Sequence, residues 1–281
     1  MKTVFSLVFA ITLLVSPTVH SAEYQSDLSY ISNQIISRVD DGDITEMMQQ
    51  LDLYRQAGLS YQSRLTVPMS VRDKDNDELA VMLGMFTFDA NYAMVFGRMA
   101  ESIDIRMFIR NTLLPRMKQG SRVDFTPARQ DLMERLMRNP QDEQARKMLN
   151  EHVASQIKRN AELAENDVEI MQMLVQGYYG AMVQGLYVAT SMSMNLPVTS
   201  EIKGLFEYQL VRLQYLDELI HNLENSEIRE ILGQEKICSI IDPIIDRLLV
   251  ARGELTPELI KDLNDLAVQA RSEYVSTLKT E

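Results

Sequence analysis

VQGYYGAMVQGLYVA, residues 175–189, is an apolar stretch that contains three glycines and three tyrosines. Its surroundings, from residue 170 to residue 194, are apolar on nearly every side when placed on a helix. A helix without a polar face must be surrounded by protein or by lipid. Gln172, Gln176 and Gln184 recur through the segment, and polar side chains are costly in lipid. The stretch therefore predicts a helix buried inside a protein.

A second segment of this kind, residues 79–97, has the sequence LAVMLGMFTFDANYAMVFG. In a membrane, Asp89 would lie in the middle of the span and would cost roughly 2.5 to 3.5 kcal/mol on insertion scales. Asn91 adds a second polar group. This segment too is predicted to be covered by protein, and no membrane span is expected after removal of a signal peptide.

Small residues suggest how the two segments meet. Gly177, Ala181 and Gly185 fall four apart, which on a helix makes a groove where another backbone can approach closely. Ala80 and Gly84 offer a counterpart on the other segment. The pattern predicts a tight crossing of two buried helices.

The whole chain has the composition of an all-α protein. Glycine and proline are sparse, and no Asn-Gly or Asp-Gly turn separates alternating apolar segments. We expect one helical domain over residues 23–281, a bundle or array of about ten helices around the two buried central ones. The predicted helices span residues 24–39, 43–57, 75–98, 100–118, 127–138, 140–164, 167–194, 201–224, 227–251 and 257–278.

Several helix ends are set by local signals. A capping residue followed by proline supplies an oxygen for free N–H groups and a preformed first turn, which predicts starts at Thr126-Pro127, Asn139-Pro140 and Thr256-Pro257. Ser200 is a fourth predicted start. Pro243 is expected to end or kink its helix near Asp242, because proline removes a backbone donor and clashes with the preceding turn.

The first 22 residues have the pattern of a signal peptide. Lys2 precedes an apolar segment at 4–15, and small residues lead to a cleavage site after Ser21 or Ala22. The apolar segment is too short for a spanning helix of about 20 residues, so a retained anchor is the less favoured alternative. We expect a periplasmic or secreted protein.

The single cysteine, Cys238, lies between apolar neighbours and is expected to be a buried, unreactive thiol.

Charge and motifs exclude several classes of function. The net charge of −12 and the lack of a basic cluster argue against a nucleic-acid partner. His152 and His221 are the only histidines after the signal peptide, and neither belongs to a recognisable catalytic motif. The Glu218-x-x-His221 pair has di-metal spacing but lacks a second half, so His221 is expected to pair with Asp217 or Glu218. No catalytic residue, cofactor or metal site is predicted.

The candidate site is a polar group within the two buried segments: Asp89, Asn91, Tyr178, Tyr179, Gln184 and Tyr187. Buried phenols usually find hydrogen-bond partners, and Asp89, Asn91 and Gln184 are the expected ones. The group is either a structural network or the polar part of an apolar ligand pocket. Two functions follow: a non-catalytic module for a protein partner, or a carrier or sensor of an apolar small molecule or lipid. An exposed apolar patch would favour the first, and a cavity beside these tyrosines the second.

Overall fold

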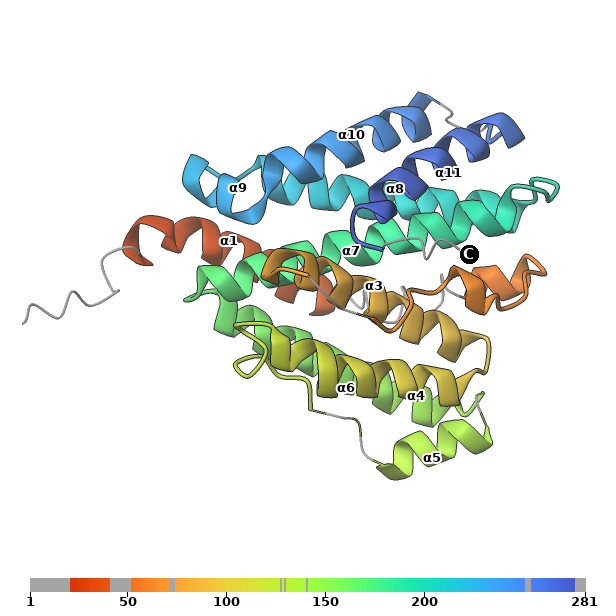
Figure 1. The fold of residues 1–281 in the computed structure, drawn as a ribbon, viewed down its shortest axis with the longest axis horizontal. Helices are drawn as coiled ribbons and strands as arrows, with labels where there is room; N and C mark the ends of the chain where they lie inside the picture. Colours follow the sequence, from red (N-terminus) through yellow and green to blue (C-terminus); the bar gives the residue numbers. More distant parts are fainter. Residues whose placement is uncertain are drawn as a thin grey trace, which may run out of the picture.

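A computed structural model describes residues 21–40, 52–70, 74–126, 128, 130–139, 141–250 and 254–275. Throughout these ranges the chain is helix, turn or loop with no strand, so the all-α prediction is confirmed. Figure 1 shows the helices packed roughly side by side. The α-helices are α1 (Ser21–Asp40), α3 (Asn76–Val95), α4 (Met99–Phe108), α5 (Gln130–Arg138), α6 (Glu143–Ala164), α7 (Val168–Ser193), α8 (Ser200–His221), α9 (Ser226–Leu232), α10 (Gln234–Val250) and α11 (Pro257–Ser272).

Two predicted segments fall wholly or partly outside this description. The signal peptide, apart from Ser21 and Ala22 at the start of α1, lies in residues that the structure does not describe. The helix predicted at 43–57 is described only from residue 52, and residues 52–56 are helical.

Capping side chains explain where the helices begin. Thr256 accepts from the backbone N–H of Leu259 and starts α11 at Pro257, as predicted. Thr199 caps α8, which begins at Ser200. The start predicted at Asn139-Pro140 is wrong, because Asp142 accepts from Ala145 N–H instead and α6 begins at residue 143.

The C-terminal helices differ from the prediction at two points. The described part of the helix predicted at 227–251 is two helices, α9 and α10, because Gly233 adopts a left-handed conformation (φ 79°) that ends α9. Glycine accepts this geometry without steric cost. Of the two outcomes expected at Pro243, an end or a kink, the end does not occur, since α10 continues through this proline to Val250. Similarly, the helix predicted at 100–118 is α-helical only to Phe108. A π turn, η3 (Ile109–Leu113), and a 3₁₀ turn, η4 (Leu114–Arg116), follow it.

Helices α3 and α7 touch backbone to backbone. A Cβ atom placed on Gly84 would lie 1.7 Å from the Gly177 carbonyl oxygen, and one on Gly180 would lie 1.9 Å from the Val81 carbonyl oxygen. A Cβ on Gly177 would meet only the Ala80 oxygen, at 3.6 Å. The close approach predicted from small residues is therefore present. Gly84 and Gly180 are the positions where it leaves no room for a Cβ, and Gly177 takes part through its carbonyl group.

The buried side chains form two apolar clusters, and both draw residues from α3 and α7. Helix α7 also packs against α6, α8, α9 and α11. Among the described residues, no helix has both the length and the continuous apolarity needed to cross a membrane.

Candidate functional site

A cavity of about 270 Å³ lies beside the α3–α7 contact. Its walls come from α1, α3, α6, α7 and α8, with Tyr54 from the helical segment 52–56 and Phe125 from the loop after η4. Most of the lining is apolar, and it includes Leu83, Phe88, Phe125, Ile157, Met173 and Leu205. For scale, an apolar cavity of about 150 Å³ binds benzene. The volume therefore suits a chain of roughly ten to twelve non-hydrogen atoms.

The charged residues in the described lining are both arginines. Arg212 is buried, at 8% exposure, and its guanidinium carbon lies 5.0 Å from the ring centre of Tyr178 and 5.5 Å from that of Tyr208. Arg38 stacks on Tyr215, 3.7 Å from its ring centre. Both arginines and the three tyrosines line the cavity. Cation–π contacts of this kind orient the plane of a guanidinium group.

The tyrosines join the two arginines into one ladder. The rings of Tyr178 and Tyr215 meet edge to face, 5.9 Å apart, and Arg212 donates from Nε to the Tyr178 hydroxyl at 3.4 Å. The order along this Arg–Tyr ladder is Arg38, Tyr215, Tyr178, Arg212, Tyr208. The partner of Tyr178 is therefore an arginine, and not the amide or carboxyl group expected from the sequence.

Asn91 and Tyr54 add neutral polar groups to the wall. Asn91 accepts from Arg106 Nη2 at 2.7 Å, and burial lowers the pKa of Arg106 below its ordinary value. The Tyr54 hydroxyl donates to the Gly185 carbonyl at 3.2 Å. Burial raises the pKa of Tyr54 above its ordinary value, so this phenol stays neutral.

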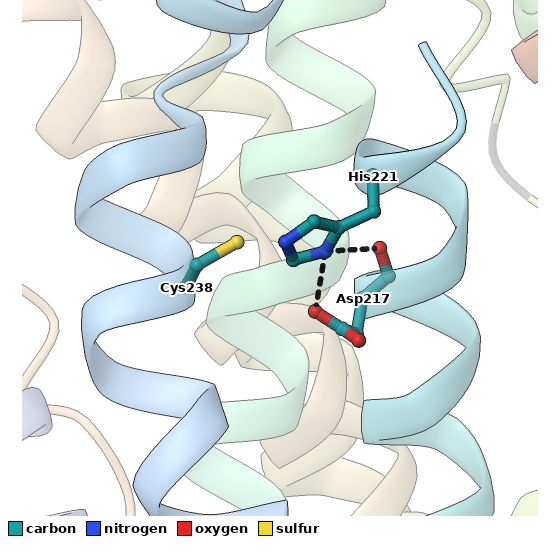
Figure 2. A group of neighbouring side chains, drawn as sticks. All are labelled: Asp217, His221 and Cys238. Carbon is teal, nitrogen blue, oxygen red and sulfur yellow. Dashed lines mark hydrogen bonds and ion pairs between the residues drawn. The ribbon is translucent and has the colours of Figure 1, made fainter.

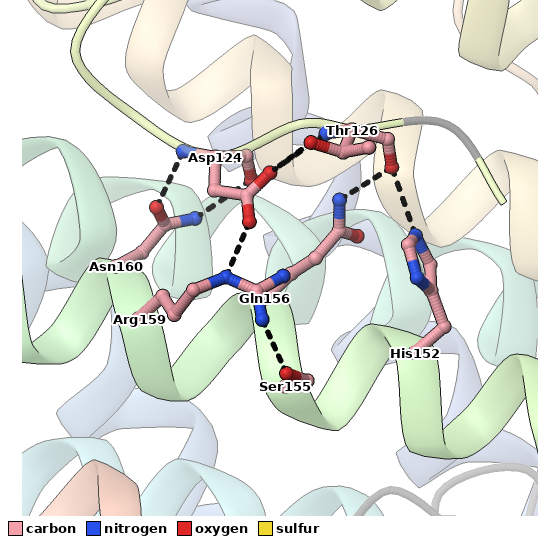
Figure 3. A network of polar contacts seen from close by, with 7 residues as sticks. All are labelled: Asp124, Thr126, His152, Ser155, Gln156, Arg159 and Asn160. Atoms are coloured by element: carbon pink, nitrogen blue, oxygen red, sulfur yellow. Dashed lines mark hydrogen bonds and ion pairs between the residues drawn. The ribbon is translucent and has the colours of Figure 1, made fainter.

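Phe125 lies in the cavity wall, and side chains of α6 bind the backbone of its two neighbours, Asp124 and Thr126 (Figure 3). Asn160 accepts from the backbone N–H of Asp124 at 2.7 Å and donates to its carbonyl at 3.1 Å. Gln156 Nε2 donates to the Thr126 carbonyl at 2.6 Å, and His152 Nε2 lies 2.8 Å from the same oxygen. The backbone on both sides of Phe125 is thus fastened to one helix.

The Asp124 side chain reinforces these contacts. It accepts from the Thr126 hydroxyl and N–H at 2.6 and 2.9 Å, and from Arg159. The hydrogen bonds from Thr126, with a smaller contribution from Arg159, lower the pKa of Asp124 to about 2. The carboxylate is therefore charged over the whole physiological range.

The rest of the predicted polar group forms a separate buried network. Asp89 is fully buried and accepts from Val67 N–H at 2.7 Å and from Gln184 Nε2 at 2.8 Å. Gln184 also donates to the Leu65 carbonyl at 2.9 Å and accepts from Arg271 Nε at 2.8 Å. Arg271 donates to the Thr66 carbonyl at 3.2 Å. This network fastens the 65–67 segment and α11 to α3 and α7.

The six candidate residues therefore lie in three places: the cavity wall, the buried network and the apolar core. Asn91 and Tyr178 line the cavity. Asp89 and Gln184 share the buried network, and Tyr187 borders it, with its ring centre 4.4 Å from the Arg271 guanidinium carbon. Tyr179 lies in the core against Tyr274.

Sequence reasoning missed the arginines. Arg212 is next to Leu213 and Arg271 follows Ala270, each at the edge of an apolar stripe. Their position at the edge of an apolar stripe is the sequence feature that could have indicated that these arginines are directed inward.

Two further residues discussed from the sequence, His221 and Cys238, lie outside the cavity lining. His221 pairs with Asp217, with 2.7 Å between Nδ1 and Oδ1, which is one of the two predicted partners. Cys238 is buried at 8% exposure, as predicted. Burial and the nearby carboxylates of Asp242 and Asp217 raise the pKa of its thiol to about 11.

Comparison of the chain with protein-family models, with curated proteins and with solved structures finds no match.

Proposed function

We propose that this protein is an exported carrier or sensor that binds a medium-length amphipathic anion, such as a ten-carbon carboxylate. The observation that carries the proposal is the charge of the cavity. Its described lining contains two arginines and no acidic residue, although the chain as a whole has a net charge of −12. An apolar pocket with a few fixed polar groups is the usual form of a small-molecule site.

The interaction-module alternative has less support. Among the residues that the structure describes, no single helix contributes more than one exposed large hydrophobic side chain: Met69, Met107, Met137, Leu163, Met194, Leu196, Val211, Val250 and Val268. Single exposed apolar residues of this kind are ordinary on a protein surface.

Export and domain organisation are part of the same proposal. Cleavage after Ser21 or Ala22 would leave Tyr24, Leu28 and Ile31, which are buried side chains of α1, in the mature chain. Residues 23–281 would then form one domain around the α3–α7 pair, since both apolar clusters include residues of these two helices. Native mass spectrometry of the protein purified from a bacterial periplasm is the first test, with an adduct that disappears on denaturation as the expected result.

A titration with three ligands that share a ten-carbon chain tests the site. We expect decanoate to bind at one per chain, more tightly than decanol and decylammonium, which have a similar number of non-hydrogen atoms. Arg212→Gln should weaken decanoate binding by roughly 10- to 100-fold, because a hydrogen bond to a charged group contributes about 1.5 to 3 kcal/mol, and should leave decanol nearly unchanged. Isothermal titration calorimetry measures both effects.

Two variants serve as controls. Arg64→Gln removes the same charge from an exposed position outside the cavity lining and should leave all three affinities unchanged. Gly177→Leu places a side chain in the cavity wall, where a Cβ has room, and should abolish binding of every ligand. Equal affinity for the anion and the cation would overturn the charge argument. Binding that survives Gly177→Leu would show that the cavity is not the site.

A further inference from the structure

Two neighbouring helices each present a pair of potential metal ligands one turn apart. Asp217 and His221 lie four residues apart on α8, and Cys238 and Asp242 lie four residues apart on α10. Residues four apart share one helix face, and α8 packs against α10. Potential ligand atoms of Asp217, His221 and Cys238 lie within 4.8 Å of one another.

The orientation of His221 suits coordination (Figure 2). Its Nδ1 contacts the Asp217 carboxylate at 2.7 Å and the Asp217 carbonyl oxygen at 3.1 Å. The other ring nitrogen, Nε2, is directed toward the Cys238 sulfur. The imidazole ring thus lies between the Asp217 carboxylate and the Cys238 sulfur, with one of its nitrogens beside each of these two donors.

From this geometry we propose that Asp217, His221 and Cys238 form a zinc-binding site on the α8–α10 surface, independent of the ligand cavity. Sulfur, imidazole nitrogen and carboxylate oxygen together are a donor set typical of Zn²⁺, whereas Mg²⁺ and Ca²⁺ take oxygen ligands. In a tetrahedral zinc site the ligand atoms lie about 3.5 Å apart. To form it, the Asp217 carboxylate would leave His221 Nδ1 and turn toward the metal, and the three donor atoms would close from separations of up to 4.8 Å.

Exposure and charge favour entry of a cation at this point. The His221 side chain is 51% exposed and that of Asp217 is 31% exposed, while Cys238 forms the buried floor. Asp242, one turn beyond Cys238, is exposed and interacts with both Asp217 and His221. Its carboxylate adds negative charge beside the three donors. Asp242 or a water molecule would supply the fourth ligand.

Cobalt is the probe of choice, because Co²⁺ substitutes for zinc and reports its ligands by absorption. We expect the mature protein to bind one Co²⁺, to show thiolate-to-cobalt charge transfer and tetrahedral d–d bands, and to lose both when equimolar Zn²⁺ is added. Cys238→Ser should abolish the charge-transfer band. His221→Ala should weaken Zn²⁺ binding by at least about 100-fold, since changes to second-shell partners alone cost 10- to 100-fold.

Glu218→Gln is the matched control. Glu218 is exposed and adjacent to Asp217, but it is not among the clustered ligands, so this variant should bind Zn²⁺ as the wild type does, while Asp217→Asn should weaken binding. Co²⁺ bound without thiolate charge transfer in the wild type would overturn the proposal, and that measurement needs no variant to fold. Equal Zn²⁺ affinity in the wild type and Cys238→Ser would also overturn it.

Discussion

Gly180→Ala is expected to destabilise the protein by about 3 kcal/mol or more, a large effect for a single methyl group. The added Cβ would lie 1.9 Å from the Val81 carbonyl oxygen and 2.8 Å from its carbonyl carbon. These are backbone atoms of α3, so no side-chain rotation can relieve the overlap. The helices must separate, and both apolar clusters include residues of α3 and α7. Gly84→Ala, with its Cβ 1.7 Å from the Gly177 oxygen, should have a similar effect.

Gly177→Ala provides the control for this prediction. Its Cβ would make only an ordinary contact, 3.6 Å from the Ala80 oxygen, and alanine favours a helix over glycine by about 1 kcal/mol. We expect this variant to be as stable as the wild type or slightly more stable. Urea unfolding followed by circular dichroism measures all three variants. Equal stability of Gly180→Ala and Gly177→Ala would mean that α3 and α7 are not in backbone contact at Gly180.

The comparison of these glycines shows what the sequence can predict about the crossing. The spacing of Gly177, Ala181 and Gly185 correctly indicated that another backbone approaches this helix, and Gly84 was correctly placed opposite. The choice between Gly177 and Gly180 depends on how α7 is rotated against α3. That rotation results from packing on all sides of α7, and periodicity is a weak guide in a helix that is apolar nearly all round.

Helix boundaries were predictable where a local interaction sets them. Thr256 starts α11 as expected, because its hydroxyl satisfies a free N–H group. Helices α9 and α10 depart from a purely local prediction in opposite ways. Gly233 ends a helix through a backbone conformation that the sequence alone permits but does not require. Pro243 is accepted within α10, where tertiary packing outweighs the local cost of proline.

The candidate site was predictable only in part, because its charged members lie far apart in the sequence. The buried polar residues of α3 and α7 stood out against apolar neighbours. Arg38, Arg212 and Arg271 come from three other helices, and charged residues on amphipathic helices normally face solvent. Only the packing of the helices shows that Arg212 and Arg271 are directed inward.

The second large effect is expected from the ionisation of Asp89. Burial raises the pKa of this carboxyl group to about 7, against the opposing influence of hydrogen bonds from Val67 and Gln184 and of the Arg271 charge. In the unfolded chain the group titrates near its ordinary value of 3.8. Between these two values the folded protein retains a proton that the unfolded chain has released. The contribution of Asp89 to stability therefore falls as the pH rises through this window and is constant above it.

Asp89→Asn isolates this contribution, because asparagine does not titrate. The difference in unfolding free energy between the wild type and Asp89→Asn should shift against the wild type by roughly 2 to 3 kcal/mol between pH 5 and pH 8, at about 1.4 kcal/mol per pKa unit. Asp124, with its pKa lowered to about 2, contributes stability that is lost only in acid below this range. Parallel pH profiles for the two proteins would place the Asp89 pKa near its ordinary value, and would mean that hydrogen bonds from Val67 and Gln184 fully offset the cost of burying its charge. A difference that shifts against the wild type as the pH rises would show that the network holding the 65–67 segment and α11 is stronger at mildly acidic pH than at neutral pH.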